Sequence, residues 1–136
     1  MKKGLYLIAF LVVFFLTTGM GGLGGTPTNK IPTPERDFSA TIIDKQNVVT
    51  KCKQVSREGD IFFLGKKGKG TVTIPFEKIE TAEFESRNGV VTAVIKLIDS
   101  QSIEIEMDKS QIFYGMTNFG TFQIEVNDLK KVTFIH

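Results

Sequence analysis

The sequence predicts an all-β protein built from two tandem copies of one five-stranded meander unit. Three observations predict this fold: apolar and polar residues alternate with a period of two, turn-forming residues recur about every 8–12 residues, and the chain matches itself at an offset of 50 residues. Alternation with a period of two is typical of strands that bury one face, because successive side chains point to opposite faces of a sheet.

The self-match aligns residues 63–84 with residues 113–134 at this one offset, without a gap. The identical pairs are Phe63/Phe113, Gly65/Gly115, Gly70/Gly120, Thr71/Thr121, Ile74/Ile124 and Phe84/Phe134. Further upstream, residues 43–48 match residues 98–103 at an offset of 55, which assigns about five extra residues to the first copy. We place these extra residues in the turn over 54–60. Such a repeat predicts one supersecondary unit that is used twice.

Each unit is expected to contain five strands, with a short turn or one 3₁₀ turn before the fifth, at 75–78 and 125–128. The dipeptide Asn88-Gly89 suits a type I′ hairpin turn and is expected to join the two units in one continuous sheet. The expected strands cover residues 39–43, 48–55, 60–64, 71–75 and 80–86 in the first unit, and residues 90–98, 102–107, 111–114, 121–125 and 130–135 in the second.

Five short strands with a tight turn before the last one form a pattern that is similar to SH3-like and Sm-like small barrels. The similarity is one of pattern, since no diagnostic motif of either family occurs. We expect a β-repeat domain over 38–136, with unit one at 38–86 and unit two at 90–136. A unit of about 45 residues buries a thin core, so the two units are expected to pack as small barrels or to merge into one β-sandwich.

The first 25 residues have the layout of a secretory signal: Lys2 and Lys3, an apolar run over 5–16, and a small-residue stretch over 17–25. This layout predicts an exported bacterial protein of the periplasm or cell surface. The apolar run of 12 residues is short for a membrane-spanning helix, and no A-x-A cleavage site follows it. An uncleaved anchor helix in the inner membrane is therefore the alternative to a cleaved signal. Residues 26–37 contain three of the four prolines and are expected to form an extended linker.

The composition argues against several classes of function. The chain has one cysteine, Cys52, and one histidine, His136, so neither an internal disulfide nor the usual ligand set of a zinc, haem or iron–sulfur site is available. No nucleophile and base can be paired, so we expect no enzyme, no metal and no cofactor. Beyond residue 3 the chain carries 15 basic and 15 acidic residues, which argues against nucleic acid as a partner. It also limits any expected membrane contact to an uncleaved N-terminal segment. Cys52 is expected to be a small core residue on the inward face with Val48.

The candidate contact residues lie in two equivalent loops. Lys66, Lys67 and Lys69 belong to a basic, glycine-rich loop, and Phe119 belongs to the uncharged loop at the same place in the second unit. Our leading hypothesis is a non-enzymatic envelope protein that binds another envelope protein or stabilises an envelope assembly, with exposed sheet edges as docking sites. The alternative is a periplasmic binding module for an anionic polymer or small ligand, which the loop over 66–69 would contact. That loop lacks the residue order of a P-loop, and a solvent-exposed hairpin tip is its other interpretation.

Overall fold

The structure is a computed structural model that describes residues 31–136. The predicted signal or anchor segment over 1–25 and the first part of the predicted linker lie outside the described residues. Between Ile31 and His136, no helix is long and apolar enough to cross a membrane. This part of the chain consists of strands, turns and two 3₁₀ turns, so the prediction of an all-β fold is confirmed.

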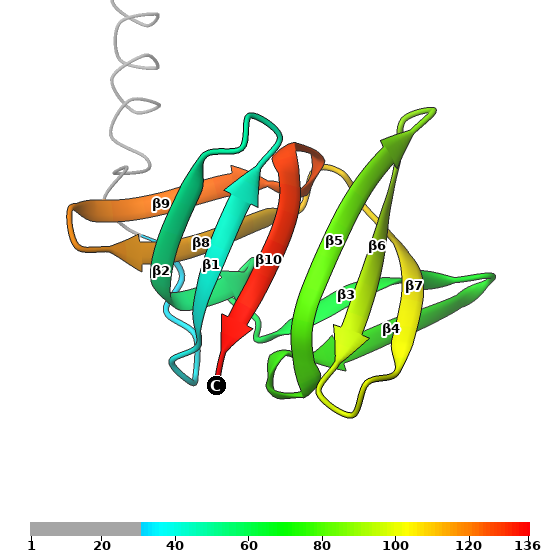
Figure 1. The fold of residues 1–136 in the computed structure, drawn as a ribbon, viewed down its shortest axis with the longest axis horizontal. Coiled ribbons are helices and arrows are strands. Elements are labelled where there is room, and N and C mark those ends of the chain that lie inside the picture. Colours follow the sequence, from blue (N-terminus) through cyan, green and yellow to red (C-terminus); the bar gives the residue numbers. More distant parts are fainter. Residues whose placement is uncertain (1–30) are drawn as a thin grey trace, which may run out of the picture. The chain divides into compact units, whose positions relative to one another are not determined.

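Ten antiparallel strands form one sheet, which curls so that its outer hairpins lie across the central strands (Figure 1). All ten predicted strands are present, with small differences in their bounds. The strands are β1 (Ser39–Asp44), β2 (Val49–Arg57), β3 (Phe62–Lys67), β4 (Gly70–Pro75), β5 (Ile79–Arg87), β6 (Val90–Leu97), β7 (Ser102–Met107), β8 (Ile112–Thr117), β9 (Gly120–Glu125) and β10 (Leu129–Ile135).

The predicted turns are also confirmed. The 3₁₀ turns η1 (Phe76–Lys78) and η2 (Val126–Asp128) precede β5 and β10. Asn88 has a φ of 52° and Gly89 a φ of 79°, and a type I′ turn requires positive φ at both positions. This turn joins β5 to β6, which pair along their whole length, so the sheet continues from the first unit into the second.

The strand pairing differs from the predicted meanders. The sheet order is β4-β3-β7-β6-β5-β10-β1-β2-β8-β9, so β2 pairs with β8 and β3 with β7, whereas β2 and β3 do not pair. Each half of the sheet thus takes three strands from one unit and two from the other, and the expectation that each unit is a five-stranded meander is wrong. The β5–β6 hairpin is as predicted, and the exchange begins beyond it, where β7 pairs with β3 of the first unit and not with β8.

Two repeated glycines mark the places where the exchanged strands meet. A Cβ atom at Gly65 would lie 2.8 Å from Ile105 Cδ1 on β7, and one at Gly115 would lie 2.7 Å from Cys52 Cβ on β2. Glycine is needed at both positions because any larger residue would push the strands apart. Cys52 and Ile105 therefore hold equivalent places, 53 residues apart, and not the 55 that the sequence match predicts.

The first copy accordingly carries three extra residues at this point rather than five. They lie in β2, where the pairing with β8 shifts register between Lys53 and Ser56. Gln54 lies within this shift and has a φ of 51°, as expected for a bulged strand. Beyond this bulge, β2 continues and pairs with the first residues of β8.

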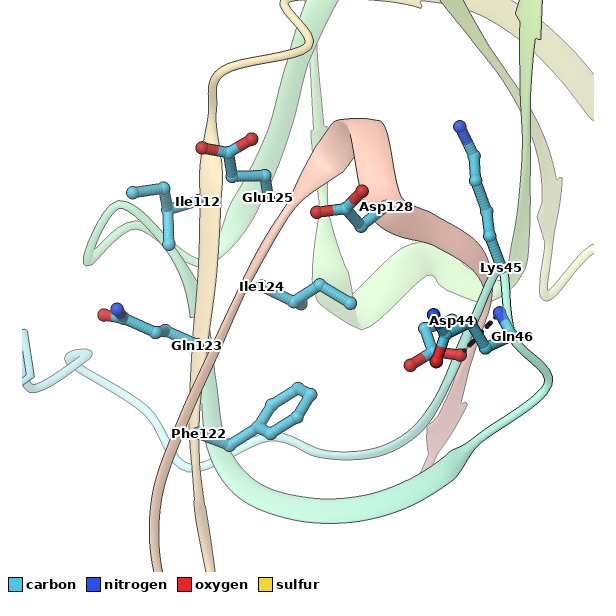
Figure 2. A pocket seen from close by; sticks show the side chains of 9 residues that line it. All are labelled: Asp44, Lys45, Gln46, Ile112, Phe122, Gln123, Ile124, Glu125 and Asp128. Atoms are coloured by element: carbon cyan, nitrogen blue, oxygen red, sulfur yellow. Dashed lines mark hydrogen bonds between the residues drawn. The ribbon is translucent and has the colours of Figure 1, made fainter.

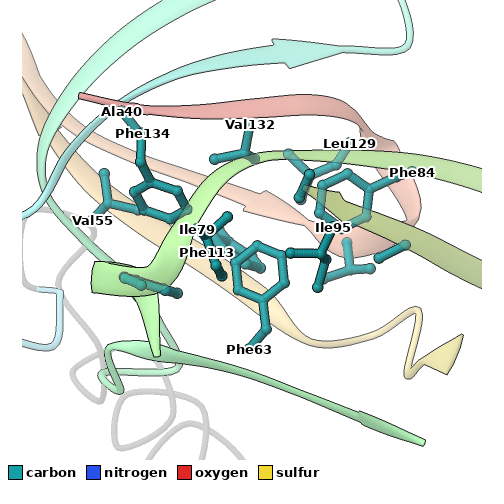
Figure 3. Packing of buried hydrophobic residues seen from close by; sticks show 14 of the residues in the cluster. Ala40, Val55, Phe63, Ile79, Phe84, Ile95, Phe113, Leu129, Val132 and Phe134 are labelled. Atoms are coloured by element: carbon teal, nitrogen blue, oxygen red, sulfur yellow. The ribbon is translucent and has the colours of Figure 1, made fainter. Parts of the chain in front are cut away.

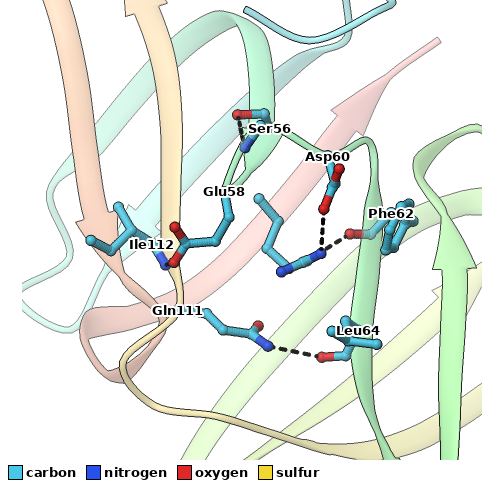
Figure 4. Close-up of polar contacts among 9 residues, drawn as sticks. Ser56, Glu58, Asp60, Phe62, Leu64, Gln111 and Ile112 are labelled. Atoms are coloured by element: carbon cyan, nitrogen blue, oxygen red, sulfur yellow. Dashed lines mark hydrogen bonds and ion pairs between the residues drawn. The ribbon is translucent and has the colours of Figure 1, made fainter. Parts of the chain in front are cut away.

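The turn after β2 attaches the first unit to the second (Figure 4). The buried Arg57 donates from Nε to the carbonyl of Phe62 and from a terminal nitrogen to Asp60 Oδ2, both over 3.0 Å. The Glu58 N–H donates to the carbonyl of Ile112, and the Ile112 N–H donates to Glu58 Oε2, both over 2.9 Å. Both hydrogen-bonding groups of the Ile112 backbone are therefore directed away from β9.

One hydrophobic core extends through both halves of the sheet (Figure 3). Its centre is a group of phenylalanine rings, in which the repeat mates Phe63 and Phe113 meet edge to face with centroids 5.3 Å apart. Phe76 and Phe134 pack beside them with centroids 4.7 Å apart. Since rings from both units fill one core, the two copies merge into one domain and do not form separate small barrels.

Cys52 is confirmed as a core residue. It is 3% exposed, and burial raises the pKa of its thiol to about 11. At neutral pH the thiol is therefore protonated, as expected for a small core residue. Val48, which we expected on the same inward face, lies in the turn before β2 and is exposed.

The described part of the predicted linker contacts the sheet. Pro34 is buried, and Arg36 forms an ion pair of 3.0 Å with Glu77 in η1. Asp37 accepts a hydrogen bond of 2.8 Å from the backbone N–H of Gln54. These contacts join the segment before β1 to η1, which follows β4, and to β2.

Candidate functional site

The structure separates the residues that the sequence singled out. Lys66 and Lys67 end β3, Lys69 lies in the β3–β4 turn, and Phe119 lies in the β8–β9 turn with 81% of its surface exposed. The two hairpins lie at opposite ends of the strand order, so the lysines and Phe119 do not form one site (Figure 1). Lys66 is paired in register with Glu106 of β7, so an acidic residue accompanies the basic loop. Ligand binding by this loop stays a prediction.

Phe119 instead belongs to an apolar hollow between the β8–β9 turn and the outer part of β1 and β2. Val49 and Ile135 line this hollow with it, and more than half of each of these two side chains is exposed. Three exposed apolar side chains in one place indicate a surface suited to contact with another molecule. The β8–β9 hairpin is thus the more apolar of the two outer hairpins.

The described part of the chain contains no evident set of metal ligands. Among residues 31–136, no three or more histidine, cysteine, aspartate or glutamate side chains are grouped so that they could hold a metal ion. The glutamates that alternate along β7, Glu104 and Glu106, are exposed.

The sheet has two free edges, β4 and β9, which are equivalent in the repeat. An edge strand presents backbone N–H and C=O groups that can pair with another chain, and proteins commonly block such edges with proline or lysine. The sequence alone did not show which strands are edges, because β3 and β8 have partners from the other unit. The two edges differ in their edge-facing backbone nitrogens and in the segments beside them, and both features decide whether a strand can be added.

The β4 edge is blocked. The N–H of Phe76 donates to the carbonyl of Ile61 over 2.9 Å, and this bond sets the alternation of the β3–β4 ladder. The backbone nitrogen of Pro75 therefore faces away from β3, towards the edge, where proline has no N–H to donate. Glu35 and Arg36 lie beside the same end of β4, lining a small hollow with Pro75. An incoming strand would lose a hydrogen bond at this edge and meet the segment before β1.

The β9 edge is open. The N–H of Val126 donates to the carbonyl of Gln111 over 2.8 Å, so the β8–β9 ladder alternates as the β3–β4 ladder does. By this alternation, the backbone groups of Gln123 and Glu125 face away from β8. Glu125 stands where the first unit has Pro75, and it keeps its N–H. This substitution is visible in the repeat alignment, but only the strand register shows that the N–H faces the edge.

A groove of about 700 Å³ follows this edge (Figure 2). Four consecutive β9 residues, 122–125, line it together with Ile112, which pairs in register with Glu125. Asp128 and residues 44–46 of the β1–β2 turn complete the lining. Because consecutive residues of one strand line it, the groove runs along the edge of β9 and is not confined to one face. Phe122 and Ile124 are partly buried against the core and form its apolar part.

Charge is concentrated at one end of the groove. The carboxylates of Glu125 and Asp128 make no hydrogen bond or ion pair with any other residue that the structure describes. By contrast, the Asp44 carboxylate accepts two backbone N–H groups of its own turn. Lys45 also lines this groove, but its ammonium donates to Ser86 Oγ over 2.9 Å and forms no ion pair with either of these two carboxylates. The groove therefore ends in two acidic groups that lack a positive partner within the described residues.

The fold and this edge define residues 31–136 as a ten-stranded β-domain with one blocked and one open sheet edge. The chain belongs to a family whose description is "Uncharacterised protein", and the family model matches residues 34–136. No curated protein and no solved structure matches the chain.

Proposed function

We propose that the protein is a non-enzymatic protein-binding module of the bacterial envelope, which binds an extended segment of a partner protein as an added strand along β9. The observation that carries this proposal is the contrast between the two equivalent edges. The β9 edge keeps the N–H of Glu125 beside a groove, whereas Pro75 blocks the β4 edge. In strand addition, backbone hydrogen bonds provide affinity, and pockets for alternate side chains provide specificity.

The location in the envelope rests on the first 25 residues, with Lys2 and Lys3 before an apolar run and a small-residue stretch. The partner is then another envelope protein, and membrane contact is made only by an uncleaved N-terminal segment. We expect N-terminal sequencing of the protein from fractionated cells to find a new terminus within about residues 20–26, in a periplasmic or surface fraction. An intact Met1 in the inner-membrane fraction would instead support the anchor, and an intact Met1 in the cytoplasm would contradict export.

The substitution Glu125→Pro tests strand addition directly. Glu125 has a φ of −74°, close to the φ of −62° at Pro75, so proline fits at this position without strain. Because its N–H faces the edge and not β8, the fold is expected to be kept, with a free energy of unfolding unchanged or raised by about 0.4–1 kcal/mol. Binding of the partner is expected to be lost, because the variant removes a donor and places a ring in the path of the added strand.

The measurement is affinity capture from envelope extracts with the wild-type protein, Glu125→Pro and the control Lys69→Ala, which changes the equivalent hairpin of the first unit. A partner is accepted when wild type and Lys69→Ala retain it. A photo-crosslinking residue at position 123 is expected to attach to that partner, and one at position 73 of the blocked edge is not. Capture by Glu125→Pro at the wild-type level would overturn the proposal.

A further inference from the structure

We infer that the hollow between the first half of β2 and the β8–β9 turn, the Phe119 hollow, binds an anionic amphiphile, which is a single alkyl chain with a negatively charged head group. The alkyl chain packs against Phe119, and the head group binds Lys51 and Lys53. This site goes beyond the proposed function, because β9 and its free edge lie on the other side of β8 from β2.

The Phe119 hollow is a gap between two strands that pair over only part of their length. In the described register, pairing between β2 and β8 begins at Lys53 and Met116, so the first half of β2 has no neighbour on this side. The tip of the β8–β9 hairpin projects beyond β2 (Figure 1). The hollow has a volume of about 560 Å³, within the range of about 300–1,000 Å³ that is typical of small-molecule sites.

The open part of β2 is too short to bind an added strand. The N–H of Asp44 donates to the carbonyl of Val48 over 3.1 Å, which sets the alternation of the β1–β2 ladder. The backbone groups of Val49 and Lys51 therefore face away from β1, towards the hollow, whereas those of Thr50 face β1. Since strands commonly span about 5–6 residues, two such residues do not support a stable strand pair. Side chains must therefore provide most of the affinity for a ligand in this hollow.

The apolar side chains of the hollow favour an alkyl chain. Phe119, Val49 and Ile135 are exposed, and the half-buried Met116 lines the hollow with them. An alkyl chain placed against these side chains removes apolar surface from water, which contributes about 25 cal/mol for each Å² of apolar surface that is buried. The apolar contact accounts for affinity, whereas the charge of the hollow selects the head group.

The charge of the hollow is positive and has no counter-charge. Lys51 and Lys53 line it, and none of the described residues that line it is acidic. Neither ammonium group forms an ion pair or a hydrogen bond with another described residue. Both lysines lie on the face of β2 opposite the buried Cys52, because they alternate with it, so one head group can contact both. An anionic head group would accept charge-assisted hydrogen bonds from them.

The other half of the sheet shows that this uncompensated charge is not a general property of the repeat. With the offset of 53 residues that relates Cys52 to Ile105, Glu106 of β7 stands where β2 has Lys53. Glu106 pairs in register with the hairpin residue Lys66, whereas Lys53 pairs with Met116. Opposite charges therefore face each other in one half, and a lysine faces an apolar side chain in the other.

The next positions differ in the same way. Glu104 stands where β2 has Lys51, and Lys69 stands at the place of Phe119 in the hairpin turn. The first hairpin thus brings basic residues to an acidic strand, while the second brings an aromatic ring to a basic strand. Only the second arrangement combines an exposed apolar surface with positive charge that is available to a ligand.

The test is isothermal titration calorimetry of the full-length protein with ligands below their micelle-forming concentrations. Decanoate is the probe, decyltrimethylammonium combines a chain of similar length with the opposite charge, and acetate has the charge without the chain. We expect decanoate to bind about tenfold more tightly than decyltrimethylammonium, with a smaller ratio at high salt, and acetate to show no measurable binding.

The variant Lys51→Glu/Lys53→Glu tests the role of charge, because it gives β2 the residues that β7 has at the equivalent positions. It is expected to fold and to reverse the preference, so that decyltrimethylammonium binds about tenfold more tightly than decanoate. Phe119→Ala is expected to weaken the binding of both ligands by about tenfold, because contact with the ring is lost. The matched control Lys66→Gln/Lys69→Gln changes two lysines of the other hairpin and is expected to keep the wild-type preference.

Absence of decanoate binding, equal binding of the two charged amphiphiles by the wild-type protein, or an unchanged preference in Lys51→Glu/Lys53→Glu would overturn the inference. Binding to phosphatidylglycerol vesicles without binding of decanoate would assign the hollow to a membrane surface instead. Binding of a capped peptide of alternating glutamate and valine, again without decanoate, would assign it to an acidic protein segment. Glu125→Pro is expected to bind decanoate as the wild type does while it loses the envelope partner, so the two proposals can fail separately.

Discussion

Phe63→Ala is expected to lower the free energy of unfolding by about 3–5 kcal/mol. The Phe63 side chain is fully buried, and its ring contacts Phe113 at 5.3 Å and Phe76 at 5.6 Å between centroids. It also lies on β3, which meets β7 from the other unit, so the cavity would form where both halves of the sheet share the core. A loss of this size is a large fraction of the stability of an ordinary domain, about 5–15 kcal/mol.

The measurement is urea unfolding of the full-length protein followed by circular dichroism and tyrosine fluorescence. The wild-type and variant proteins are expected to unfold in one transition that is the same by both probes, because one core serves both halves. Phe119→Ala is the matched control, since the same residue type is 81% exposed there, and it is expected to change stability by no more than about 0.5 kcal/mol. Two separate transitions, or a loss below about 1 kcal/mol for Phe63→Ala, would contradict the shared core.

The second large effect is expected on dividing the chain between Asn88 and Gly89. Fragment 31–88 keeps only the β1–β2 and β3–β4 pairs, and fragment 89–136 keeps only the β6–β7 and β8–β9 pairs. All remaining pairs join one unit to the other. Since isolated two-stranded hairpins are marginal in water, each fragment is expected to be unfolded alone, and an equimolar mixture is expected to recover the native β spectrum.

Far-UV circular dichroism and gel filtration measure this complementation. The control is the same chain with a protease site inserted in the Asn88-Gly89 turn, which is expected to stay assembled after cleavage because only a turn is cut. A monomeric fragment with a complete β spectrum would show that a unit folds by itself, and it would contradict the exchanged pairing that places β2 beside β8.

The local features of this protein were determined by its sequence. Alternation of apolar and polar residues set the ten strands, because the side-chain period of a strand is a local property. Asn88-Gly89 set the hairpin between the units, since these residue types accept the positive φ of a type I′ turn. The core position of Cys52 also followed from alternation, although the same argument failed for Val48 at the start of the strand.

The repeat offset shows where local patterns mislead. Asp44 accepts a hydrogen bond from the N–H of Gln46, and Asp99 accepts one from the N–H of Gln101, so both loops contain the same short turn. The two turns are offset by 55 residues, whereas the strand pairs that they connect, β1–β2 and β6–β7, are offset by 53. The turn of the second unit therefore lies two residues later between its strands than the turn of the first. A turn motif depends on local hydrogen bonding, so a match between two turns does not fix the register of the strands around them.

The choice of strand partners was decided only by the tertiary structure. Two similar copies offer each strand a partner in its own unit and an equivalent one in the other, and the sequence does not distinguish these long-range alternatives. Once the β5–β6 turn places β6 beside β5, β3 and β8 pair with strands of the other unit, and β4 and β9 become the edges. The difference between Pro75 and Glu125 is present in the sequence, but only the strand register shows that both backbone nitrogens face a sheet edge, where the N–H of an added strand's partner residue matters.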